Sequence, residues 1–173
     1  MEKLLAQIIG ILAIITITIS VHFKKKNHMM LVQSLAHLFY CTQYILLGAY
    51  SAAYMDGVAI ARNLIYYKFD ETKTKIPIIF PILLCTIIII IGYFNYDGLL
   101  SLIPIVITLA YTISATFKNP KIFKCTFGFC ALIWLYYNYK CGAYVCIIGN
   151  VMEFSSTAIA LIKERKRKKK YFF

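Results

Sequence analysis

Apolar residues gather along this chain in seven runs, each near the length of a membrane-spanning helix. A helix needs about 20 mostly apolar residues to cross a bilayer, and charged or turn-forming residues separate the runs. The pattern therefore predicts an all-α membrane protein with seven transmembrane helices. The runs cover residues 4–21, 29–47, 51–67, 76–93, 99–117, 122–137 and 143–162.

The composition agrees with a lipid environment. Hydrophobic residues make up 61% of the chain and charged residues 15%, against about 45–50% and about 25% in soluble domains. A soluble fold of this size could not bury so much apolar surface. We therefore expect a multi-pass protein of the cell membrane, with the lipid bilayer as its main partner.

The basic residues indicate an orientation. With the N-terminus outside and the C-terminus inside, every one of the 19 Lys and Arg residues except Lys3 and Lys140 falls at an inner connection or inner helix end. This is the distribution that the positive-inside rule describes. We therefore ascribe the net charge of +12 to topology and expect no nucleic-acid partner. The basic tail is expected to bind anionic lipids.

The chain also repeats itself at an offset of 94 residues, where residues 18–20 match 112–114 and residues 48–50 match 142–144. The expected organisation is a three-helix repeat over 1–68, a linker with the fourth helix over 69–98, a second repeat over 99–163 and a basic tail over 164–173. A single linker helix makes both repeats cross in the same direction. The sequence thus predicts a 3+1+3 arrangement of two parallel repeats, a plan found among transporters.

Several short segments resemble the YgjV-type bacterial inner-membrane proteins, and the likeness covers nearly the whole chain. Residues 6–10, 44–50, 61–65, 130–134 and the helix after Gly142 carry it. The resemblance implies an inner-membrane location and no particular activity. The 3+1+3 plan is also similar to the SWEET and PQ-loop carriers, although this chain has no Pro-Gln dipeptide.

Four residues are candidates for a substrate site between the repeats. Asp56 matches Asn150 at the repeat offset, and Tyr40 matches Trp134, so each pair is expected at equal depth. Aromatic faces with a few directional polar groups are typical of small-molecule pockets. The resemblance to SWEET carriers implies a sugar-site role for Trp134 and Asn150. Asp56 has the alternative of a hydrated cap near the outer end of its helix.

Two further pairs are of interest. Arg62 is expected to reach Glu153 and form an ion pair between the repeats, either a static brace or a gate. Gly10 matches Pro104 at the repeat offset, and both residues weaken a helix. They are either hinges or ordinary membrane-helix residues.

His37 is a further candidate, either as a proton relay or as a partner in an interhelical hydrogen bond.

The chain carries no common catalytic motif, and none of its six cysteines forms a CxxC pair. We therefore expect no enzyme activity, no cofactor and no metal site. The predicted function is a small-solute transporter or facilitator with a central site, and the alternative is a non-transporting receptor or scaffold. A wet cavity that reaches Asp56 and Asn150 favours transport, whereas a dry, packed centre favours a scaffold. The sequence defines neither the solute nor the oligomeric state.

Overall fold

The computed structural model describes residues 2–20, 23, 26–72, 74–116 and 120–170, and all regular secondary structure in these ranges is α-helical. The prediction of an all-α fold with seven helices is confirmed for these residues. The helices are α1 (Glu2–Ser20), α2 (Lys26–Leu46), α3 (Tyr50–Glu71), α4 (Ile79–Phe94), α5 (Leu99–Thr116), α6 (Pro120–Cys141) and α7 (Tyr144–Lys170).

Several helix bounds depart from the apolar runs, those of α4 and α7 among them. α4 begins at Ile79, three residues after the start of its apolar run, because Pro77 disfavours a helical conformation at the residue before it. Pro81 lies in the first turn of α4, where a missing N–H breaks no helical hydrogen bond. α7 continues to Lys170, so the stretch expected as a separate tail is helical there. The basic side chains of this stretch lie outside the described residues.

Two glycines reverse the chain between neighbouring helices. Gly48 (φ 71°) ends α2 and Gly142 (φ 77°) ends α6, both in the left-handed region that favours glycine. In the first turn the N–H of Ala49 donates to the carbonyl of Tyr44 at 2.9 Å, and Ala143 donates to Asn138 at 2.9 Å in the second. Because these turns are so short, α2 and α3 are antiparallel neighbours, as are α6 and α7.

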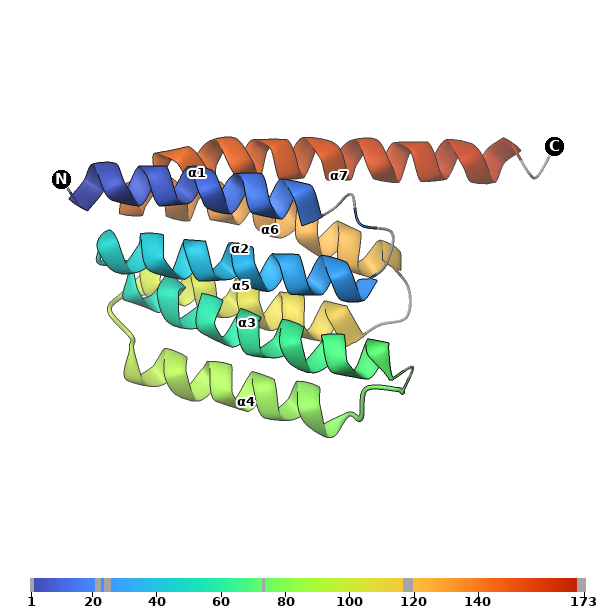
Figure 1. Ribbon diagram of the computed structural model, residues 1–173, viewed down its shortest axis with the longest axis horizontal. Helices are drawn as coiled ribbons and strands as arrows, with labels where there is room; N and C mark the ends of the chain where they lie inside the picture. The colour runs from blue at the N-terminus through green and yellow to red at the C-terminus, as the bar shows by residue number, and fades with distance from the viewer. Residues whose placement is uncertain (1, 21–22, 24–25, 73, 117–119, 171–173) are drawn as a thin grey trace.

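Six of the helices form a closed ring, and α4 lies outside it. Around the ring the contacts run from α1 to α2, α3, α5, α6, α7 and back to α1, while α4 packs against α3 and α5 (Figure 1). The helices lie roughly along one direction, with α1, α3, α5 and α7 pointing the same way. The side-chain amide of Gln7 joins α1 to the start of α7, donating to the carbonyl of Gly142 at 2.8 Å and accepting from the N–H of Val145 at 3.2 Å.

The outer surface of the bundle is apolar and much of its interior is polar. Outward faces carry exposed leucines and isoleucines, such as Leu4 and Ile89, whereas Gln43, Asn63 and Thr112 are almost fully buried. This distribution is typical of a protein whose solvent is lipid. Two helices, Glu2–Ser20 and Leu99–Thr116, are both long and apolar enough by themselves to span a membrane. The orientation with the N-terminus outside stays a prediction.

Candidate functional site

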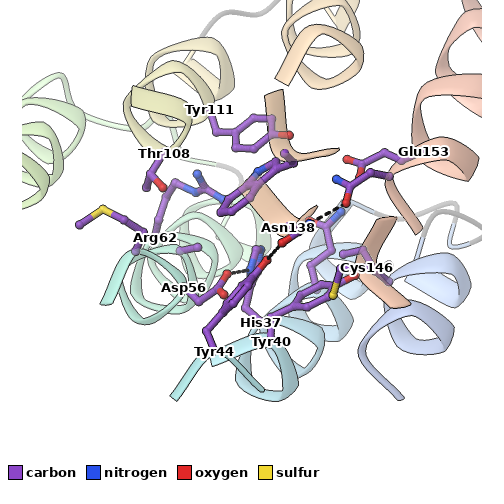
Figure 2. A pocket seen from close by; sticks show the side chains of 16 residues that line it. His37, Tyr40, Tyr44, Asp56, Arg62, Thr108, Tyr111, Asn138, Cys146 and Glu153 are labelled. Atoms are coloured by element: carbon purple, nitrogen blue, oxygen red, sulfur yellow. Dashed lines mark hydrogen bonds and ion pairs between the residues drawn. The ribbon is translucent and has the colours of Figure 1, made fainter. Parts of the chain in front are cut away.

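A cavity of about 100 Å³ lies at the centre of the helix ring, and all six ring helices contribute to its wall (Figure 2). Several polar and aromatic side chains face it from opposite sides. The four residues expected at a substrate site, Tyr40, Asp56, Trp134 and Asn150, all line this one cavity. Reasoning from the repeat thus singled out residues that lie together in the fold.

Asp56 is held at the cavity wall by a contact between α2 and α3. Its Oδ1 lies 2.7 Å from Nδ1 of His37, and only 7% of Asp56 is exposed. The alternative of a hydrated helix cap does not fit this burial. His37 itself makes the interhelical hydrogen bond that one of its two interpretations predicted.

Asn150 belongs to a hydrogen-bonded chain that crosses the ring. The hydroxyl of Tyr44 donates to Oδ1 of Asn138 at 2.7 Å, and Nδ2 of Asn138 donates to Oδ1 of Asn150 at 2.9 Å. The chain connects α2, α6 and α7, and all three side chains are buried. Because buried polar groups in a low-dielectric interior are costly unless paired, this chain orders the centre of the bundle.

Sequence reasoning missed Tyr44 and Asn138, although a signal for them was present. The two residues are 94 positions apart, which is the repeat offset, and each lies in the last turn before its glycine. Under the expected two-fold repeat, equivalent residues touch only close to the axis that relates the repeats. A polar or aromatic pair at the repeat offset beside the turns was therefore a candidate for the centre of the fold.

Aromatic rings cover another part of the wall. Tyr44 stacks on Tyr40 with ring centroids 6.4 Å apart, and on Trp134 with centroids 6.0 Å apart and planes inclined by 14°. Tyr137 meets the edge of the Trp134 ring, with centroids 5.3 Å apart. The expected aromatic pair, Tyr40 and Trp134, is thus joined through Tyr44. The faces of such rings attract cations and pack against planar or apolar groups.

Arg62 and Glu153 both line the cavity, but the expected ion pair between them is not formed. Figure 2 shows them on opposite sides of the cavity. The guanidinium of Arg62 instead donates from Nε and Nη2 to Oδ1 of its neighbour Asn63, at 3.3 and 3.2 Å. The amide of the adjacent Asn63 is an acceptor that the sequence-based prediction for Arg62 did not include.

Gly10 and Pro104 are both buried in the ring, in α1 and α5. A Cβ at Gly10 would lie 2.5 Å from Nε2 of Gln43, so the absence of a side chain lets α1 approach α2. Pro104 lies inside an unbroken α5, and the hydroxyl of Thr108 donates to its carbonyl at 2.7 Å. These contacts give Gly10 a packing role, and a hinge role for either residue stays a prediction.

The described part of the chain contains no group of three His, Cys, Asp or Glu side chains that could hold a metal ion. His37 and Asp56 form a pair, and the other polar groups of the cavity are amides, hydroxyls, a thiol, an indole N–H, a guanidinium and the carboxyl group of Glu153. Their chemistry is that of reversible hydrogen bonding and charge pairing. The arrangement suits the binding of a small polar solute.

Comparison with known proteins agrees with the membrane-type surface. A family model described as a bacterial inner membrane protein, Imp-YgjV, matches residues 4–168. No curated protein and no solved structure matches the chain. Since the family model spans nearly the full length, this chain belongs to the YgjV family of bacterial inner membrane proteins.

Proposed function

We propose that this protein is a transporter or facilitator for a small solute, which crosses the membrane through the centre of the helix ring. The observation that carries the proposal is the cavity lined by all six ring helices, with Asp56 on one wall and Asn150 on another. A polar cavity at the centre favours transport over a scaffold, for which a dry, packed centre is expected.

The proposal includes seven transmembrane helices in a 3+1+3 arrangement. Support comes from features that recur at the repeat offset. α3 begins at Tyr50 and α7 at Tyr144, 94 residues apart. The equivalent glycine turns and the contact between Tyr44 and Asn138 follow the same offset.

The ring is also built from equivalent contacts. α1 contacts α7, and α5 contacts α3; under the repeat these two interfaces correspond to each other. Apart from side-chain contacts such as that between Tyr44 and Asn138, these are the two interfaces at which one triplet of helices meets the other. Rocking of the triplets about the cavity would loosen these interfaces in turn, which is the usual route to alternating access.

The cavity volume limits the solute that this state accommodates. About 100 Å³ is well below the roughly 300–1,000 Å³ of sites for drug-sized ligands. A solute of a few non-hydrogen atoms fits, and a sugar ring requires a more open state. The proposed solute class is accordingly smaller than the sugars of the SWEET carriers.

A flux assay with a cavity-filling variant tests the proposal. The protein is reconstituted in liposomes, and re-swelling after osmotic shock is followed by light scattering with urea, glycerol, glycine, acetate and glucose. We expect faster re-swelling with at least one of the small solutes than in empty liposomes. Ala59, which lines the cavity, is changed to Leu to obstruct the path, and Ala59→Leu should abolish the increase.

Ala61→Leu is the matched control, because Ala61 lies on the same helix but faces outward. It should keep the wild-type flux. Equal flux in liposomes with and without protein, for every solute, would contradict transport and favour the scaffold alternative. Flux that survives Ala59→Leu would contradict a path through this cavity.

A further inference from the structure

Two charged side chains on α3 each leave one buried polar atom without a hydrogen-bond partner. These atoms are Oδ2 of Asp56 and Nη1 of Arg62. Both residues line the central cavity, and they are only 7% and 8% exposed. A buried polar atom without a partner is rare in native proteins because it loses its hydration without compensation. Asp56 and Arg62 therefore each carry one unsatisfied polar atom beside the cavity.

Local contacts fix the direction of both groups. His37 holds the Oδ1 atom of Asp56 at 2.7 Å, which leaves Oδ2 as the second acceptor. Asn63 binds Nε and Nη2 of Arg62, which leaves Nη1. Figure 2 shows Asp56 and Arg62 on the same side of the cavity. The two residues are six positions apart on α3, so their backbone positions are separated by about 9 Å along the helix axis at 1.5 Å per residue.

From this pairing we propose that the cavity binds a small zwitterion of the α-amino-acid type, with its carboxylate on Arg62 and its ammonium on Asp56. The inference rests on the proposed transport function and names its solute class. A guanidinium is permanently charged and well suited to a carboxylate. An α-amino acid carries both charged groups on one short N–Cα–C unit, so a single small molecule presents a carboxylate to Arg62 and an ammonium to Asp56.

The surrounding charges favour a zwitterion over a simple ion. A small anion would meet the carboxyl group of Asp56 in the same cavity, and a small cation would meet Arg62. A molecule with both charges has one partner for each. The rings of Tyr40 and Trp134, which also line the cavity, suit an ammonium group on their faces. In this state the volume of about 100 Å³ favours glycine or alanine over amino acids with large side chains.

Thermal unfolding of the full-length protein in detergent tests the inference through the ligand. The compounds are glycine, alanine, leucine, glycinamide, acetate, methylammonium and urea. We expect glycine and alanine to raise the melting temperature in a saturable way. Glycinamide lacks the carboxylate and acetate lacks the ammonium, so each should bind about tenfold or more weakly. A shift with acetate, methylammonium or urea as large as that with glycine would overturn the inference. An equal shift with leucine would also overturn it.

Variants of the protein supply the second test. Asp56→Asn and Arg62→Gln should each weaken glycine binding about tenfold or more. Asp70→Asn and Lys68→Gln are matched controls, since both residues are exposed on the same helix, and they should bind as the wild type does. Wild-type glycine affinity in both cavity variants would overturn the inference. If Arg62→Gln does not fold, the comparison of glycine with acetate and glycinamide on the wild-type protein decides.

Binding and flux separate this inference from the transport proposal. Saturable glycine binding without flux of any solute would contradict transport and leave the assignment of the ligand standing. Flux of urea or acetate through the cavity, blocked by Ala59→Leu and accompanied by no glycine binding, would support transport and overturn the zwitterion assignment.

Discussion

At the residue scale, the fit between α1 and α2 depends on a missing side chain at Gly10. A Cβ there would lie between 2.5 and 2.8 Å from the amide group of Gln43. Gln43 is fully buried and accepts a hydrogen bond from the thiol of Cys146 at 3.0 Å. The amide therefore has little room to move away from a new methyl group.

We predict that Gly10→Ala lowers the free energy of unfolding by about 1–3 kcal/mol, the usual cost of overpacking. Gly57→Ala is the control, because a Cβ at Gly57 meets nothing within 4 Å, and it should be neutral or stabilise α3 by up to about 1 kcal/mol. Thermal or chemical unfolding in detergent measures both. Equal stability of the two variants would show that Gly10 is not a packing residue and would reopen its role as a hinge.

The hydroxyl of Tyr44 is the donor that begins the polar chain across the ring. Tyr44→Phe would leave Oδ1 of Asn138 without this donor, and we expect a loss of about 1 kcal/mol, typical of an interhelical hydrogen bond in a membrane protein. Tyr54→Phe, at an exposed position of α3, should change stability little. A double-mutant cycle with Asn138→Ala measures the coupling, and a coupling energy of zero would mean that the contact contributes nothing.

At the element scale, the two glycine turns end α2 and α6 in the same way. Both glycines have a positive φ, and a Cβ would meet no neighbour at either site. The cost of a substitution there comes from the backbone alone. We therefore predict that Gly48→Ala and Gly142→Ala each destabilise the fold by about 1–2 kcal/mol, by equal amounts within error.

Asparagine tolerates the left-handed region better than alanine, so Gly48→Asn and Gly142→Asn should each cost less than the alanine variants. Unfolding experiments on the four variants provide the comparison. Alanine variants as stable as the asparagine variants would argue against backbone strain. A large difference between the two sites would argue against equivalent turns in the two repeats.

The helices themselves were largely predictable from the sequence, because lipid solvation requires long apolar runs and glycine or charge marks their ends. The start of α4 was less predictable, since Pro77 interrupts helical structure inside an apolar stretch. The bounds of α2 and α6 differ from the predicted apolar runs because polar residues such as Lys26 continue a helix beyond its apolar part. Hydropathy indicates where a chain contacts lipid, whereas hydrogen bonding sets where a helix begins and ends.

At the scale of the whole molecule, the repeat offset located the candidate site better than any motif. It identified Asp56, Asn150, Tyr40 and Trp134, which line one cavity. It did not identify the partners of these residues, because a side chain such as Arg62 has several acceptors within reach. Arg62 binds Asn63 and not Glu153. Which acceptor it binds depends on side-chain rotamers and on the width of the ring, and a sequence pattern contains neither.

The central claim is that a solute crosses the membrane through the cavity at the centre of the ring. Such a path requires the cavity to open to water, and two native cysteines test this most directly. Cys146 and Cys130 are each 2% exposed, but Cys146 lines the cavity whereas Cys130 is not among its lining residues. The protein in liposomes is treated with a small charged methanethiosulfonate reagent, and each cysteine is quantified by mass spectrometry. We predict that Cys146 is labelled, that Cys130 is not, and that Ala59→Leu slows the labelling. Equal protection of both cysteines until the protein is denatured would contradict the account and indicate a dry, closed centre.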